Sequence, residues 1–380
     1  DKFGLPIDPD TLVTNLSVSE KQRLEILKTL YRDCKLLILD EPTAALTPQE
    51  TDTLFSTIKQ MVKEGLSVIL ISHKLNEILS VSDKIVVLRN GRMVGEVPTV
   101  EANRTKLAEM IVGGTVEYPQ KEILNRGAEV IKFQDISCNP INESSKGLNE
   151  VSFRLYEGQI FGIAGVTGNG QLPLAKMMAG HLAPTKGEIY YKESKVTNHN
   201  PRNFMSLGIA YVPEDRNTDG LVGDMSVWEN AVITETEDSR LRTPLGWLNR
   251  ENCKIVAETL CKTYDVRTQS LQQPARLLSG GNVQKLLLGR WLTRKPKLLI
   301  ACQPTRGLDE GAIASIQKII LSVRQEGNAV LLITEDLDEL LMLSDRIAVI
   351  YNGNLSKSYS VEELDRTRIG LMMAGEEFND

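Results

Sequence analysis

The stretch Lys35-Leu-Leu-Ile-Leu-Asp-Glu-Pro-Thr43 decides how the rest of this chain is interpreted. Its consecutive apolar residues predict a strand that is buried on both faces, as in a parallel sheet. Two carboxylates, Asp40 and Glu41, follow at the point where that strand should end. Because ligands bind at the carboxyl ends of parallel strands, both residues are candidates for a functional site.

A second version of this stretch, Lys297-Leu-Leu-Ile-Ala-Cys-Gln-Pro-Thr305, lies further along the chain. It keeps the apolar strand and the Pro-Thr, but it has neither carboxylate. Other matches have the same offset: Leu16-Ser17 with Leu278-Ser279, Ser82-Asp83 with Ser344-Asp345, and Asn90-Gly91 with Asn352-Gly353. A register held without gaps over about a hundred residues indicates two copies of one domain.

Helical and strand patterns alternate within each copy, with strands predicted at Ser67–Ile71 in the first and at Val151–Leu155 in the second. This alternation predicts an α/β fold. We expect a first copy in residues 1–112, a linker in 113–128, a second copy in 129–375 and an acidic tail in 376–380. By the offset, the first copy should begin roughly 130 residues before Asp1. We therefore expect the first copy to be incomplete and the chain to be part of a longer one, although a natural truncated repeat is an alternative.

The composition narrows the range of functions. The net charge of −6 gives no reason to expect a nucleic-acid surface. The sequence contains no run of about 18 or more uncharged apolar residues, so it predicts no membrane-spanning helix. The five cysteines include no CxxC pair, which suits a reducing compartment better than a disulfide framework or a zinc site.

A glycine-rich loop, Gly165-Val-Thr-Gly-Asn-Gly170, follows a predicted strand and precedes a predicted helix. The spacing of Gly165, Gly168 and Gly170 is that of a phosphate-binding loop, in which backbone N–H groups approach phosphate. A working loop continues with Lys and Ser or Thr, whereas this one continues with Gln171 and Leu172. The alternative is a tight strand-to-helix turn.

Leu278-Ser-Gly-Gly-Asn282 is a second stretch that suits an anion. Ser279, Gly280, Gly281 and Asn282 precede a predicted helix and offer a hydroxyl and free N–H groups to a phosphate. In the first copy the same place reads Ser17-Val-Ser-Glu20. That pattern is a capping box, so we favour a purely structural role for it.

The side chains after the strands suggest a division of labour. Asp40 can hold Mg²⁺ directly or through water, and Glu41 can orient an attacking water as general base. His73 follows the next strand and could contact a γ-phosphate, although a lone histidine there is often only polar surface. The second copy has Cys302, Gln303 and Glu335 at these three positions. It has therefore lost the metal ligand and the general base.

The order of these motifs resembles the nucleotide-binding domain of ATP-binding-cassette (ABC) transporters. Two such domains in tandem resemble the ATPase subunit of simple-sugar and nucleoside importers. The sequences of three motifs are most similar to the nucleoside branch of this family. These motifs are Gly165-Val-Thr-Gly-Asn-Gly-Gln171, Tyr211-Val-Pro-Glu-Asp-Arg216 and Gln303-Pro-Thr-Arg-Gly-Leu-Asp309. The resemblance covers nearly the whole chain, and it implies two P-loop NTPase domains of which the first is incomplete.

In this family the two domains pair head to tail, and each ATP lies between one domain's phosphate loop and the other's signature. The resemblance therefore implies one catalytic site with Asp40 for Mg²⁺ and with Glu41 and His73, completed by Ser279–Asn282. The opposite site would be degenerate, because it combines Gly165–Gln171, Cys302, Gln303 and Glu335 with Ser17–Glu20, which departs from the signature pattern. Binding of nucleotide without turnover at this site is an open alternative. Glu214 stands where the family's Q-loop residue would face the membrane subunits.

The resemblance also implies partners. These are two transmembrane permease subunits and, indirectly, an extracytoplasmic substrate-binding protein, with this ATPase subunit at the cytoplasmic face of the membrane. The chain alone should hydrolyse little ATP. Two rival functions remain: a soluble tandem ABC ATPase acting on ribosomes, which the short linker disfavours, and a non-catalytic nucleotide-sensing or dimerisation module, which the altered loop favours.

Overall fold

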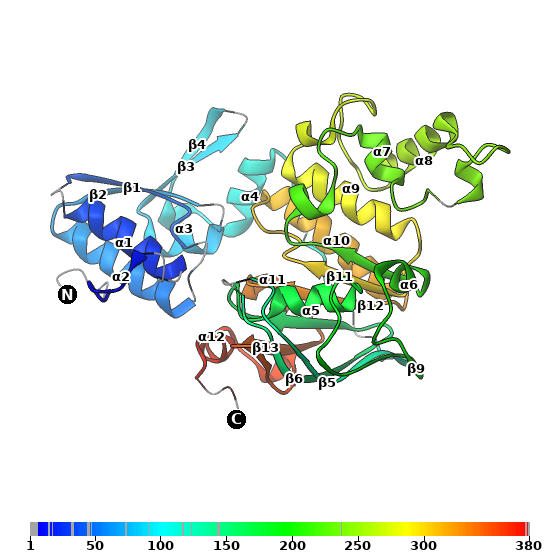
Figure 1. Cartoon of the computed structure of the whole chain (residues 1–380). Helices are drawn as coiled ribbons and strands as arrows, with labels where there is room; N and C mark the ends of the chain where they lie inside the picture. The colour runs from blue at the N-terminus through cyan, green and yellow to red at the C-terminus, as the bar shows by residue number, and fades with distance from the viewer. Residues whose placement is uncertain are drawn as a thin grey trace. The chain divides into compact units, whose positions relative to one another are not determined.

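The computed structural model describes residues 7–13, 16, 18–31, 34–43, 46, 48–72, 74–89, 91–115, 118–122, 124–142, 145–236, 238–376 and 378. Ser17, His73 and three residues of the predicted 376–380 tail lie outside this set. The chain forms two compact units (Figure 1). The first is Asp1–Glu117 with the short segments Asp309–Gly311 and Gly370–Glu377, and the second contains the remainder.

The first unit contains a pair of parallel strands and a hairpin. Strands β1 (Leu36–Asp40) and β2 (Ser67–Ile71) are parallel, whereas β3 (Lys84–Arg89) and β4 (Arg92–Pro98) are antiparallel. Its helices are α1 (Val18–Leu30), α2 (Pro48–Lys63), α3 (Leu75–Val81), the short η2 (Thr99–Glu101) and α4 (Arg104–Val112). Asp40, the last residue of β1, is paired in register with Ile71 of β2.

The second unit is built on a seven-stranded sheet. Five strands are parallel, in the order β10 (Ile209–Val212), β11 (Leu298–Cys302), β12 (Ala329–Thr334), β7 (Ile160–Ala164) and β13 (Arg346–Tyr351). Both β14 (Asn354–Leu355) and β15 (Tyr359–Ser360) pair with β13 in the antiparallel sense. The strand that leads into the glycine loop, β7, therefore lies inside the sheet between β12 and β13.

A second, antiparallel sheet has the order β6 (Leu148–Tyr156), β5 (Glu129–Cys138), β8 (Lys186–Tyr191) and β9 (Ser194–Lys195). The longer helices of this unit are α5 (Gln171–Met178), α6 (Pro201–Ser206), α7 (Val227–Val232), α8 (Arg250–Thr263), α9 (Gly280–Leu292), α10 (Glu310–Gln325), α11 (Leu337–Leu343) and α12 (Arg366–Ala374). Short helical turns are η3 (Arg216–Gly220), η4 (Ser239–Leu241), η5 (Ala275–Leu277) and η6 (Val361–Glu363).

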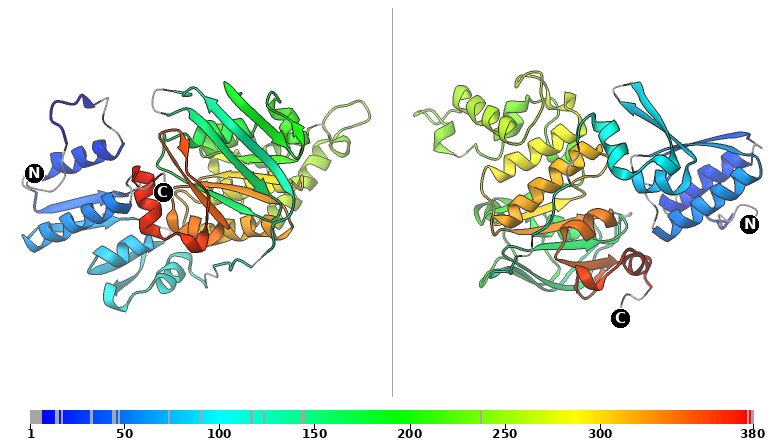
Figure 2. Two further views of the ribbon diagram at one scale, coloured as in Figure 1. Left: turned by 90° about the horizontal axis from the view of Figure 1, so that it is seen from below. Right: turned by 180° about the vertical axis from the view of Figure 1, so that it is seen from behind.

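Two hydrophobic cores cover the two faces of the seven-stranded sheet. On β11, Leu298 and Ile300 point into the core shared with β5, β6 and α5, whereas Leu299 and Ala301 point into the core shared with α9 and α10. Figure 2 shows helices on one side of these strands and the antiparallel sheet on the other. Because β11 is buried along its whole length, its side chains are apolar on both faces.

The structure confirms the internal repeat element by element. The described elements α1, β1, α2, β2, α3, β3, η2 and α4 correspond, in order, to α9, β11, α10, β12, α11, β13, η6 and α12. The first residues of each pair are separated by the same offset that relates Lys35 to Lys297. The first copy has no counterpart of β5 to β9 among its described residues. This register confirms the α/β fold and the tandem repeat.

The prediction that the first strand is buried on both faces is wrong for β1. Leu36 and Ile38 are 49% and 60% exposed, whereas their counterparts Leu298 and Ile300 are fully buried. In the second unit β5, β6 and α5 cover that face. The described part of the first unit contributes no such layer, so its strands have one covered face only.

Among the described residues, no helix is both long enough and apolar enough to cross a membrane.

Candidate functional site

The end of β1 presents the two carboxylates predicted from the sequence. Asp40 is exposed at the last position of the strand, and Glu41 follows in the left-handed region, with a φ of 47°. Its backbone N–H donates to the carbonyl of Ile71, with an N–O distance of 2.8 Å. A residue other than glycine is held in this conformation at a cost, and such strain is concentrated at functional sites. His73 lies outside the described residues.

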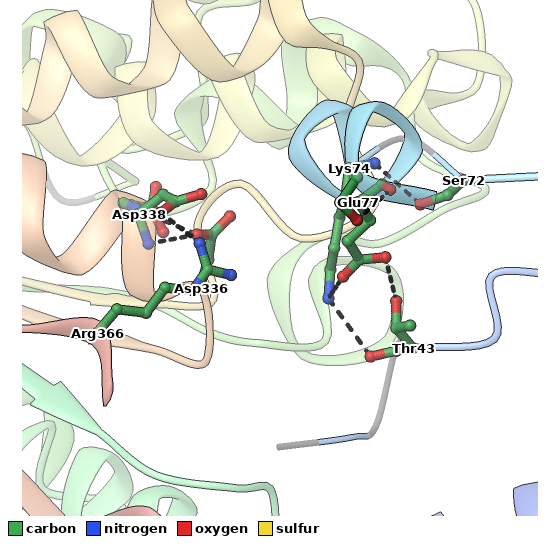
Figure 3. A network of polar contacts seen from close by, with 9 residues as sticks. Thr43, Ser72, Lys74, Glu77, Asp336, Asp338 and Arg366 are labelled. Atoms are coloured by element: carbon green, nitrogen blue, oxygen red, sulfur yellow. Dashed lines mark hydrogen bonds and ion pairs between the residues drawn. The ribbon is translucent and has the colours of Figure 1, made fainter. Parts of the chain in front are cut away.

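A buried polar contact holds the turn after Glu41 against α3 (Figure 3). The Thr43 hydroxyl, which is fully buried, donates to Glu77 Oε2 at 2.5 Å. Lys74 Nζ lies 3.2 Å from Glu77 Oε1 and donates to the Thr43 carbonyl at 3.4 Å. This contact could not be predicted from the sequence, because nothing in the local pattern links the threonine to a glutamate on the far side of α2 and β2.

The second unit repeats the turn with different side chains. Gln303 has the same φ of 47°, and its N–H donates to the carbonyl of Ile333 at 2.7 Å. Its side-chain oxygen accepts from the N–H of Glu335 at 3.3 Å. Cys302 is buried, and burial raises the pKa of its thiol so that it stays neutral. This turn therefore offers no charge to a metal and no base to a water molecule.

The glycine loop joins β7 to α5, as predicted. Gly168 and Gly170 have φ values of 96° and 119°, which L side chains rarely adopt. A Cβ on Gly165 would lie 2.6 Å from Ile350 Cγ2, so only glycine fits there. Gln171, the first residue of α5, is buried and donates from Nε2 to the Val166 carbonyl at 2.8 Å. The side chain in the lysine position therefore closes the loop on itself.

Glu335 contacts this loop directly. Its Oε1 accepts hydrogen bonds from the N–H of Thr167, at 2.5 Å, and from the Thr167 hydroxyl. The contact follows from the sheet, because Thr334 of β12 is paired with Ala164 of β7. The residue after each strand is thereby brought to the same edge.

The predicted signature lies at the start of α9, whose N-cap is Ser279. Asn282 Nδ2 donates to Ser279 Oγ at 2.8 Å, and Asn282 Oδ1 accepts from the N–H of Arg267 at 2.8 Å. Ser279 and Gly280 are exposed. A helix of this length with exposed N–H groups at its start is suited to bind an anion.

Beyond β10, Glu214 pairs with Arg306, whose Nη1 lies 2.6 Å from Glu214 Oε1. Arg216 Nη2 donates to the Arg306 carbonyl at 2.7 Å. Burial raises the pKa of Glu214, and the Arg306 guanidinium acts in the opposite direction. Glu214 could be singled out from the sequence, but its pairing with Arg306 could not, because the two residues are far apart in the chain and meet only through the sheet.

The described residues contain no group of three or more His, Cys, Asp or Glu side chains placed to hold a metal ion. This finding is compatible with Mg²⁺, because Mg²⁺ is commonly held by one or two carboxylates together with substrate phosphates. An exposed strand-end carboxylate such as Asp40 fits that arrangement.

Three features together define an ATP-binding cassette of the P-loop class. They are the parallel sheet, the glycine loop after its inner strand β7, and the serine-glycine start of α9. A family model described as "ABC transporter" matches residues 1–44 and 148–306. The chain also resembles a nucleotide-free ATP-binding cassette from an ABC transporter, with 25% identity and a TM-score of 0.53 over 64% of this chain and 95% of that one.

Several import ATP-binding proteins are similar to this chain over nearly its whole length. The glucose import ATP-binding protein TsgD13 of Haloferax volcanii is 44% identical, covering 99% of this chain and 68% of that protein. The nucleoside import ATP-binding protein NupA of Lactococcus lactis is 39% identical, covering 100% and 75%. The guanosine import ATP-binding protein NupO of Bacillus subtilis is 40% identical, covering 99% and 73%. The chain belongs to the ABC transporter family and to its ATPases.

Proposed function

We propose that this chain is part of the ATP-hydrolysing subunit of an importer for nucleosides or simple sugars. The named relatives support this proposal, because their names specify import of glucose, of nucleosides and of guanosine. Because the similar proteins include both sugar and nucleoside importers, the proposal includes both substrate classes. Hydrolysis would take place at one of two composite sites, and the other would be degenerate.

One observation supports this asymmetry above the others. Glu41 and Gln303 share a φ of 47° and the same backbone hydrogen bond to the neighbouring strand. The two copies therefore present the same backbone turn with different chemistry: Asp40 and Glu41 in one, Cys302 and Gln303 in the other. A neutral thiol and an amide cannot replace a metal-binding carboxylate and a general base.

In the proposed catalytic site, the Glu41 carboxylate accepts a proton from the water that attacks the γ-phosphate. The Asp40 carboxylate would hold Mg²⁺, which supplies charge neutralisation to the phosphates. His73 would contact the γ-phosphate. The N–H groups and hydroxyl of Ser279–Asn282 would complete the site from the second repeat, in the head-to-tail pairing inferred from the family resemblance.

This site also requires a phosphate loop for the first repeat, and residues 1–112 contain no such glycine pattern. The described strands β2 and β3 belong to separate sheets, whereas β7 lies between their counterparts β12 and β13. We infer that a strand carrying a phosphate loop fits between β2 and β3. This strand would be the first repeat's equivalent of β7.

The proposed partners are two transmembrane permease subunits, and an extracytoplasmic protein would deliver the substrate to them. The subunit would then act at the cytoplasmic face of the membrane. Uptake into vesicles that contain this subunit, permease subunits and a substrate-binding protein tests this proposal. We expect ATP inside the vesicles to drive accumulation of radiolabelled guanosine, ribose or glucose, and labelled glutamine to stay outside as a control.

Accumulation of neither a nucleoside nor a sugar would contradict the proposed substrate class. Uptake that is unchanged when this subunit is omitted would contradict its role in coupling. Hydrolysis stimulated several-fold by the transported solute is the result that we expect, and a non-catalytic nucleotide-sensing module would not produce it.

A further inference from the structure

The phosphate loop of the second repeat is occupied by a carboxylate of the same chain. Glu335 Oε1 accepts hydrogen bonds from both the N–H and the hydroxyl of Thr167, in the middle of the loop. A backbone N–H in such a loop is the group that would otherwise bind a phosphate oxygen. Glu335 therefore uses a donor that a nucleotide would need.

The position of Glu335 in the sheet makes this contact possible. Strands β12 and β7 are paired up to Thr334 and Ala164, so that Glu335 and Gly165 leave the sheet as neighbours. The counterpart of Glu335 in the first repeat is His73. An imidazole at this position can donate a hydrogen bond to a phosphate, whereas a carboxylate can only accept one and repels it.

The loop holds no cation that would offset this carboxylate. Gln171 stands in the lysine position, and both Gln171 Nε2 and Asn169 Nδ2 donate to the Val166 carbonyl, at 2.8 and 3.0 Å. Nearby, Arg306 is paired with Glu214 at 2.6 Å. In the part of the chain that the structure describes, no ion pair links Glu335 to a lysine or an arginine.

The loop is also held in place from outside. Asn169 Oδ1 accepts from the N–H of Asn352 at 2.8 Å, and the carbonyl of Gly168 accepts from the N–H of Lys146 at 2.7 Å. A loop fixed at both of these points keeps the N–H of Thr167 directed at Glu335. Its shape therefore remains suited to an anion.

We propose that the Glu335 carboxylate takes the place of a nucleotide phosphate on the Gly165–Gln171 loop and thereby keeps the second repeat free of nucleotide. The inference rests on the proposed function, in which this loop is a vestigial ATP site. A tethered group acts at an effective concentration on the order of millimolar. ATP would have to displace Glu335 from the loop, and the loop lacks the lysine and the metal ligand that would favour ATP. Glu335 is thus the residue that excludes nucleotide from this loop.

Nucleotide binding by the full chain and by Glu335→Gln tests the proposal. The glutamine keeps the size of the side chain and removes its charge. Equilibrium dialysis with radiolabelled ATP, with and without Mg²⁺, gives the Kd and the number of nucleotides bound. Photolabelling with 8-azido-ATP, followed by peptide mapping, shows whether the label lies next to the 165–178 segment.

We expect the unchanged chain to bind almost no ATP at this segment. Glu335→Gln should bind about one ATP per chain, with a Kd roughly tenfold or more below that of the unchanged chain. Glu335→His, which restores the residue of the first repeat, is a second variant with the same expected direction. Asp336→Asn removes the neighbouring exposed carboxylate, keeps the helix cap, and should behave like the unchanged chain.

Two results would overturn the proposal. One is ATP binding at this segment by the unchanged chain with the same Kd as Glu335→Gln. The other is failure of both Glu335 variants to bind more tightly than the unchanged chain. The ATPase rate of the protein with a complete first repeat tests the proposed function separately, because that rate depends on Glu41.

Discussion

Single substitutions between the two repeats change the charge of otherwise equivalent places. Glu77 in the first repeat and Glu339 in the second occupy the same position of the repeat. Glu77 is paired with Lys74, whereas Glu339 has Asp336 in the place of that lysine. Both carboxyl oxygens of Glu339 are buried without a well-formed hydrogen bond among the described residues. Burial, and then Asp336, raises the pKa of Glu339 to about 8.

This shift predicts a pH-dependent stability. Between its ordinary pKa of 4.5 and about 8, Glu339 keeps a proton in the folded state that the unfolded chain releases. The free energy of unfolding therefore falls as pH rises through this window, by at most about 1.4 kcal/mol per pH unit. Glu339→Gln should remove that slope. Its stability relative to the unchanged chain should increase steadily from pH 5 to pH 8.

Urea unfolding followed by tryptophan fluorescence measures this effect, because all three tryptophans, Trp228, Trp247 and Trp291, belong to the second unit. The exposed Glu326→Gln serves as the control and should leave the slope as it is. Equal slopes for Glu339→Gln and the unchanged chain would show that Glu339 is ionised in the folded protein.

The identity of the site residues could be predicted from the sequence, but their partners could not. Asp40, Glu41 and Ser279–Asn282 have types and spacings that imply their chemistry. The contact of Glu335 with Thr167 depends on the pairing of β12 with β7, two strands that are far apart in the sequence. The pairing of Glu214 with Arg306 likewise depends on neighbouring strands, β10 and β11.

At the scale of elements, the position of β7 depends on a buried ion pair. Arg324, at the end of α10, donates from Nε and Nη2 to the two oxygens of Asp345, both at 2.8 Å. Asp345 Oδ2 also accepts from the N–H of Ile160, the first residue of β7, at 2.8 Å. Because the Arg324 side chain is only 2% exposed, its charge needs this partner.

We expect Asp345→Asn to destabilise the second unit by roughly 3–5 kcal/mol, because it leaves the Arg324 guanidinium buried and unpaired. Urea unfolding at constant pH measures this loss. The matched control is Asp338→Asn, which breaks the exposed pair with Arg366 and should cost less than about 1 kcal/mol. Similar losses in the two variants would contradict the role assigned to the buried pair.

Apolar periodicity and turn residues predict that an element exists, but they predict its first and last residues less closely. Strand β2 spans Ser67–Ile71, as predicted. Strand β6, predicted at Val151–Leu155, extends over Leu148–Tyr156, because its polar residues still pair with β5 through an irregular register. The exposed face of β1 could not be foreseen from its own apolar residues, since exposure depends on which layer covers the strand.

At the scale of the whole molecule, one domain design occurs twice with one register and two chemistries. Every described helix and strand of the first repeat has a counterpart at the same offset in the second, so the alterations in the second repeat do not reflect a different fold. Apart from the Ser17–Glu20 position, the differences in reactive side chains lie at the ends of β11 and β12 and of their counterparts β1 and β2. The two repeats therefore share a backbone and differ in the reactive side chains at these places, as the proposed asymmetry requires.

Hydrolysis is proposed to depend on Glu41 and not on its counterpart Gln303. The most direct measurement is the ATPase rate of the protein with a complete first repeat and its permeases, for Glu41→Gln and Gln303→Ala. We expect Glu41→Gln to lower the rate by about 10²–10⁴-fold, as for loss of a general base, and Gln303→Ala to leave it within about twofold. An unchanged rate in Glu41→Gln, or equal losses in both variants, would contradict the proposed role of Glu41.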